Sequence, residues 1–118
     1  MSQYVLLYRS TNEQSRAAMG TPEQAEKSMA KWRAWIGDMK GRKQLTDVGM
    51  PLDRTGMVIA GAQKLVTDGP YTETKEVVGG FSIIEAWDLA QAVKIASGCP
   101  ILEGGGSVEV RPVMPLDV

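Results

Sequence analysis

One nine-residue segment, residues 68–76, gathers most of the side chains that could do chemistry. Asp68, Glu73 and Glu76 place three carboxylates within it, and Lys75 lies between the last two. Acid–base chemistry from such groups needs one carboxylate whose pKa is raised by burial or by a like-charged neighbour. If the protein is an enzyme, we expect Asp68 and Glu76 to be its catalytic groups. Glu73 and Lys75 are then expected to bind the ligand, since a lysine can hold an anion or stabilise developing negative charge.

The same segment also has the composition of a turn. The Asp68 side chain can cap its own backbone, Gly69 can take a positive φ, and Pro70 fixes the direction in which the chain leaves. The charged side chains that follow would then be solvated, or would form salt bridges between subunits. Both interpretations stay open, and convergence of the carboxylates on an enclosed cavity would favour an enzyme.

A second polar group is predicted on the last strand. Glu109 and Arg111 lie two positions apart and therefore share one face of that strand, opposite the valines that alternate with them. Arg9, just after the first strand, is expected near them. Facing a dimer interior, they would form a partly buried ion pair that could bind an anion. The alternative is an ion pair that only orients the sheet or stabilises a dimer.

The aromatic residues divide into two predicted roles. Tyr4, Tyr8 and Tyr71 combine an apolar ring with a hydroxyl, and we expect them to line a cleft. Trp32 and Trp35 lie at helical spacing among other apolar residues, which is typical of a core stripe rather than of a ligand pocket.

The composition excludes several classes of chemistry. The 118 residues include no histidine and one cysteine, Cys99. No catalytic Ser-His-Asp or Cys-His pair, imidazole acid or histidine metal ligand is therefore available. A lone cysteine forms neither an intrachain disulfide nor a cysteine-rich zinc site. We predict no cofactor and no metal site, although a Mg²⁺ or Ca²⁺ site built only from carboxylates stays open.

Charge and hydropathy limit the partners. The net charge of −1 gives no electrostatic footprint for nucleic acid. The longest apolar run near the N-terminus, residues 4–8, is too short for a membrane span or a signal peptide. Together with the single cysteine, this predicts a cytoplasmic protein.

The pattern of elements predicts one α+β domain over residues 1–118. A helix is expected from Pro22, capped by Thr21, to Gly41, and a second after the cap Asp88. Residues 10–20 are expected to be a loop, and residues 42–55 an irregular connection. Strands are predicted at residues 4–8, 57–60, 64–67, 81–86 and 107–111. The order is that of a ferredoxin-like β-α-β-β-α-β antiparallel sheet, with two helices on one face and an extra hairpin.

Two helices can cover only one face of such a sheet. Yet the first strand is apolar on both sides, and so is the strand at 81–86, where Phe81 and Ile83 oppose Ile84 and Ala86. An uncovered apolar face is an association surface. We therefore predict a homodimer with two-fold symmetry whose sheets pack face to face.

Residues 68–76 read Asp-Gly-Pro-Tyr-Thr-Glu-Thr-Lys-Glu, and Gly79-Gly80-Phe81 follows them. This resembles the signature of the DGPF subgroup of the YCII-related family, with Tyr71 in place of the phenylalanine. The resemblance extends through the closing residues 107–113 and covers most of the chain.

The resemblance implies a ferredoxin-like fold that assembles as a dimeric α+β barrel. In the wider family a histidine–aspartate pair has been proposed as the active site, and some relatives eliminate halide from aromatic substrates. That mechanism cannot be carried over to a chain without histidine. Members of the subgroup are also described as encoded beside extracytoplasmic-function sigma factors.

Residues and resemblance together lead to one predicted function. It is a homodimer that binds a small polar or anionic ligand in a cleft around residues 68–76. The alternatives are a lyase or isomerase that uses carboxylate and lysine groups, and a non-enzymatic accessory protein linked to sigma-factor regulation.

Overall fold

Four strands form one antiparallel sheet in the computed structural model, which describes residues 1–69 and 75–116. Its order is β2-β5-β1-β6, and a separate two-stranded sheet consists of β3 and β4. The elements are β1 (Ser2–Ser10), α1 (Asn12–Met19), α2 (Pro22–Gly41), β2 (Leu45–Asp47), β3 (Met57–Ala60), β4 (Leu65–Asp68), β5 (Val77–Ala86), α3 (Leu89–Ala96), the 3₁₀ turn η1 (Pro100–Leu102) and β6 (Ser107–Pro112). The predicted ferredoxin-like α+β fold is confirmed.

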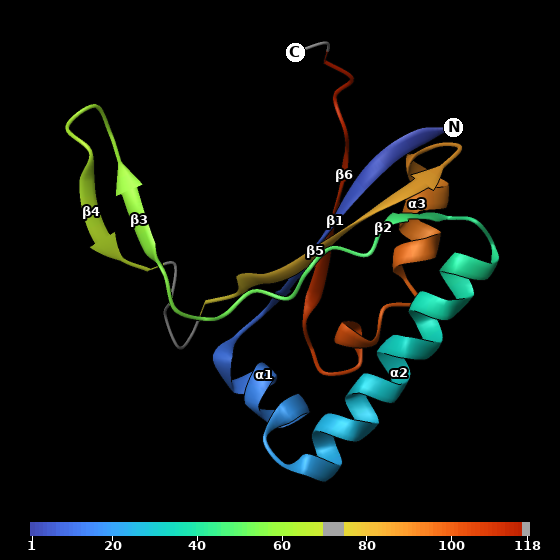
Figure 1. Ribbon diagram of the computed structural model, residues 1–118, viewed down its shortest axis with the longest axis horizontal. Coiled ribbons are helices and arrows are strands. Elements are labelled where there is room, and N and C mark those ends of the chain that lie inside the picture. Colours follow the sequence, from blue (N-terminus) through green and yellow to red (C-terminus); the bar gives the residue numbers. More distant parts are fainter. Residues whose placement is uncertain (70–74, 117–118) are drawn as a thin grey trace.

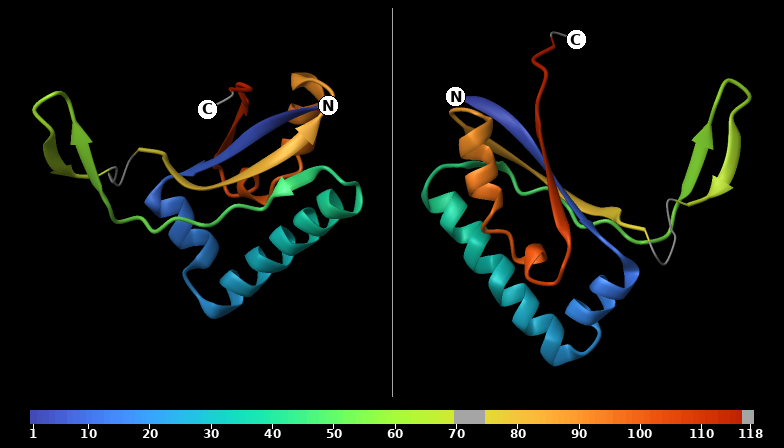
Figure 2. Two further views of the ribbon diagram at one scale, coloured as in Figure 1. Left: turned by 45° about the horizontal axis from the view of Figure 1, so that its top comes forward. Right: turned by 180° about the vertical axis from the view of Figure 1, so that it is seen from behind.

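The helices leave one face of the four-stranded sheet uncovered (Figures 1 and 2). Leu6 of β1 and Ile84 of β5 are fully buried beneath the helices, and Tyr4 and Tyr8 flank Leu6 on the same face. Because side chains alternate along a strand, the odd-numbered residues of β1 point the other way. The core is therefore a single layer between sheet and helices.

Two helices begin where the sequence predicted. The Thr21 hydroxyl accepts a hydrogen bond from the Gln24 amide at 3.1 Å, and the Asp88 carboxylate accepts one from the Gln91 amide at 2.8 Å. Each cap satisfies an amide that has no partner within the helix.

The two tryptophans of α2 belong to the core, as predicted. Trp32 and Trp35 pack against the buried cluster and stand edge to face with Tyr8, with ring centroids 4.9 and 6.1 Å away. This arrangement is favoured by the quadrupoles of the rings.

Two predictions of irregular structure are wrong. Residues 10–20, expected to be a loop, contain α1, which begins with a capping box in which Thr11 and Gln14 bond each other's backbone amides. Residues 42–55, expected to be irregular, contain β2, which pairs with β5. The β5 strand also begins at Val77 rather than at Phe81, because its first residues pair with the end of β1.

The predicted hairpin is present and projects away from the rest of the molecule (Figure 1). All eight of its strand residues are exposed, among them Met57 at 71%, Ile59 at 69% and Leu65 at 65%. Among the helices described, none combines the length and apolar character that crossing a bilayer requires.

Candidate functional site

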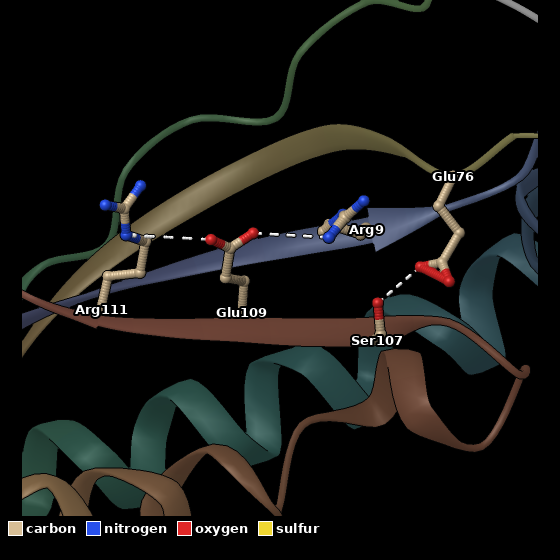
Figure 3. A network of polar contacts seen from close by, with 5 residues as sticks. All are labelled: Arg9, Glu76, Ser107, Glu109 and Arg111. Carbon is tan, nitrogen blue, oxygen red and sulfur yellow. Dashed lines mark hydrogen bonds and ion pairs between the residues drawn. The ribbon is translucent and has the colours of Figure 1, made fainter.

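A charged cluster on the uncovered face of the sheet brings together three of the predicted site residues (Figure 3). Glu109 of β6 lies between two guanidinium groups: its Oε1 is 3.4 Å from Nη1 of Arg9, and its Oε2 is 3.8 Å from Nε of Arg111. The strands position these groups, because β1 and β6 run antiparallel with Leu7 opposite Glu109 and Val5 opposite Arg111.

The cluster continues toward the segment that carries the carboxylates. Glu76, just before β5, accepts a hydrogen bond from the Ser107 hydroxyl at 2.5 Å. Ser107 is the residue opposite Arg9 in the β1–β6 ladder. Glu76 therefore lies at the end of the same polar face as Arg9, Glu109 and Arg111.

In a single chain these ion pairs are exposed. The side chains of Arg9 and Glu109 are each 40% accessible, and that of Arg111 is 68% accessible. Exposed pairs contribute at most about 1 kcal/mol to stability. The arrangement can still bind a ligand, because each of the two guanidinium groups has five N–H donors and Glu109 occupies only some of them, so donors are left for an anion.

Asp68, Lys75 and Glu76 do not converge on an enclosed cavity. Asp68 ends β4 in the projecting hairpin, and both Asp68 and Lys75 are exposed. Neither they nor Glu76 line the cavity of about 660 Å³ between α1, α2 and the sheet. Tyr71 and Glu73 lie outside the described residues. Within the described parts of the chain, residues 68–76 thus form no enclosed acid–base pair.

A family model, the YCII-related domain, matches residues 3–117 of this sequence. The chain belongs to the YCII-related family. No curated protein matches the sequence. The match spans nearly the whole chain, so the sheet, the helices and the hairpin all belong to the YCII-related domain.

The one cysteine of this YCII-related domain is a poor nucleophile. Cys99 is buried in the core, and burial raises the pKa of its thiol to about 12. The thiol is therefore protonated at neutral pH, whereas nucleophilic attack needs the thiolate. In residues 1–69 and 75–116, no group of three or more acidic or cysteine side chains could hold a metal ion.

Sequence reasoning missed Arg54. Its guanidinium donates to the Ser10 carbonyl at 2.9 Å, to the Thr11 carbonyl at 3.3 Å and to the Ser10 hydroxyl. Nothing local predicts this contact, because it joins residues 44 positions apart. Of the tyrosines expected to line a cleft, Tyr8 lines the cavity beneath α1 and α2, while Tyr4 is buried in the core.

Proposed function

We propose that this YCII-related domain, of the DGPF type by its residues 68–76, is a homodimer that binds a small polar or anionic ligand at the edge of its uncovered sheet face. The observation that carries the proposal is that face. At its centre lie Val5 and Leu7 of β1 and Phe81 and Ile83 of β5, paired across the strands and covered by none of the described helices.

A second copy of the chain suits this face better than an unlike partner. Apart from its apolar centre, the face carries two arginines, Arg9 and Arg111, and three glutamates, Glu76, Glu85 and Glu109. Both signs of charge lie on the face, so two copies related by a two-fold axis can bring arginines of one copy opposite glutamates of the other. Because β6 is an edge strand, the cluster around Glu109 would lie at the rim of the dimer interface, where it is partly desolvated, which strengthens charge-assisted hydrogen bonds, but still open to a ligand.

The β3–β4 hairpin supports the same assembly. An isolated two-stranded hairpin is marginally stable in water, and this one exposes apolar side chains such as Met57, Ile59 and Leu65. Its sheet neighbours none of the four core strands. Packing against a second copy would supply the contacts that the single chain does not provide.

The charged side chains at the edge of the uncovered face support a small polar or anionic ligand. Arg9 and Arg111 flank Glu109, and Glu76 reaches the same face through Ser107. A small anion could bridge the two guanidinium groups, while hydroxyl groups on a polar ligand could donate to the carboxylates.

The assembly is tested by light scattering coupled to size exclusion. We expect twice the mass of the 12.8 kDa chain at micromolar concentration. Leu7→Lys should give a folded monomer, because the buried ammonium would lose its hydration while Glu109, the residue opposite, is already paired with two arginines. Val93→Lys is the matched control: Val93 is 48% exposed on α3, and the dimer should persist. A monomeric wild type, or equal effects of both variants, would refute the interface.

Ligand binding is tested by calorimetry with citrate as the anionic probe and glycerol as the neutral one. We expect citrate to bind and Arg111→Gln to weaken it several-fold. Arg33→Gln, which removes an arginine paired with Glu26 on α2, should leave citrate binding unchanged. Absence of citrate binding, or equal loss in both variants, would contradict the assignment of this cluster.

A further inference from the structure

A cavity of about 660 Å³ lies on the opposite, helix-covered side of the sheet. Its walls come from α1, α2, the segment of residues 48–54 and the ends of β1 and β5. The volume falls in the range of pockets that bind small organic molecules. Met29, Trp32 and Ile36 present one apolar wall from α2, and Leu52 lies in the segment of residues 48–54.

Arg54 supplies a fixed polar group in this cavity. Its three hydrogen bonds, to the Ser10 carbonyl, the Ser10 hydroxyl and the Thr11 carbonyl, hold the guanidinium at the end of β1. A guanidinium has five N–H donors, so two are left for a ligand. Because the group is already held by the backbone, binding costs little further side-chain entropy.

The charge balance of the cavity favours an anion. Of the residues that the structure describes, three charged ones line it, and two of them, Lys31 and Glu103, pair with each other at 2.6 Å. In the described parts of the chain, no carboxylate lies within ion-pair distance of Arg54. The described lining of the cavity therefore carries one positive charge beside an apolar wall.

We propose that this cavity binds a small monocarboxylic acid, with its carboxylate on Arg54 and its apolar body against Trp32. A planar carboxylate matches the fork of the guanidinium and carries one negative charge. A phosphate dianion would leave one charge uncompensated against the apolar wall. The site lies on the covered face of the sheet and needs no second copy, so it does not depend on the proposed dimer.

The test compares two soluble probes of the same shape, 4-phenylbutyrate and 4-phenylbutanol, by NMR. The chain has three tryptophans, whose indole N–H signals are well separated from the backbone region. Trp32 lines the cavity, and Trp87, which is 70% exposed and does not line it, is the internal control. We expect a saturable shift of the Trp32 signal with little change at Trp87, and about tenfold tighter binding of the acid.

Three variants assign the selectivity to Arg54. Arg54→Met should weaken binding of the acid about tenfold and leave binding of the alcohol nearly unchanged, because only the acid interacts with the positive charge of Arg54. Arg54→Lys should restore part of the preference for the acid. Arg42→Met is the matched control, since Arg42 pairs with Asp38 on the surface and does not line the cavity. A thermal melt of each variant establishes that it is folded.

A steric variant gives a second measurement if Arg54→Met unfolds. Ala18 of α1 lines the cavity, so Ala18→Phe should reduce its volume and weaken both probes. The proposal is overturned if neither probe shifts Trp32 saturably at millimolar concentration. It is also overturned if acid and alcohol bind equally, or if Arg42→Met weakens the acid as much as Arg54→Met.

Discussion

Two linked, buried hydrogen bonds lead to a prediction about the free energy of unfolding, and the sign of the predicted change can be tested. The Tyr8 hydroxyl donates to Ser82 Oγ at 2.7 Å, and the Ser82 hydroxyl donates to the Val48 carbonyl at 2.6 Å. Tyr8 is 7% exposed and Ser82 is 2% exposed. These two hydrogen bonds connect β1 to β5 and β5 to the residues that follow β2.

The two single variants should differ because they leave different groups without a partner. Tyr8→Phe removes one bond, and Ser82 still donates to Val48, so we expect a loss of about 0.5–1.5 kcal/mol in the free energy of unfolding. Ser82→Ala removes both bonds and leaves the buried Tyr8 hydroxyl without an acceptor. We expect a loss of about 2–3 kcal/mol there.

The double variant reverses the sign of the tyrosine substitution. In the Ser82→Ala background, Tyr8→Phe removes an unsatisfied hydroxyl and should be neutral or stabilising. Urea unfolding at fixed protein concentration measures the free energy of unfolding of the four proteins of this double-mutant cycle: the wild type, the two single variants and the double variant. Ser97→Ala, an exposed serine that bonds the Val93 carbonyl, should change stability by no more than about 0.5 kcal/mol. Two outcomes would contradict the linked hydrogen bonds of Tyr8, Ser82 and Val48. Either Ser82→Ala lowers the free energy of unfolding no more than Tyr8→Phe does, or the losses of the two single variants add in the double variant.

Two further predictions concern single residues of the fold. Burial raises the pKa of Cys99 from 9.0 to about 12, so the folded chain retains a proton that the unfolded chain loses, and the free energy of unfolding should fall as pH rises from 9 toward 12. Cys99→Ala should flatten that decline in urea titrations at several pH values; an unchanged slope would contradict the assignment. Gly49 has φ +71°, and a Cβ there would lie 1.7 Å from the Phe81 carbonyl oxygen, so Gly49→Ala should strongly lower the melting temperature. Gly37→Ala, in open space on α2, should instead stabilise by about 0.5–1 kcal/mol, and similar melts for both variants would refute the close approach.

Local signals in the sequence were sufficient for elements whose caps and periodicity agree. Thr21 and Asp88 begin their helices as predicted, since a cap followed by apolar spacing leaves few alternatives. The first helix was missed although Thr11 and Gln14 carry a capping box, because residues 12–19 show no apolar stripe that would mark a core face. The short β2 has no pattern of its own and is a strand only because β5 pairs with it.

The candidate site was predictable to the extent that it follows from strand alternation. Glu109 and Arg111 share a face because they lie two apart, and Arg9 joins them through the pairing of the first and last strands. The cavity could not be predicted. Its polar group, Arg54, binds Ser10 across 44 residues, and no local pattern encodes such a contact.

Alternation in β1 also separates the two proposals physically. Tyr8 and Ser10 point into the cavity, whereas Leu7 and Arg9 point to the uncovered face. A substitution at an even-numbered position of this part of β1 therefore changes the cavity, and one at an odd-numbered position changes the uncovered face. In both cases the strand keeps its register. Leu7→Lys should abolish the dimer and leave binding of 4-phenylbutyrate intact, while Arg54→Met should weaken the acid and leave the dimer intact. If either variant disturbed both properties, the two faces of β1 would be coupled and the sites could not be treated as independent.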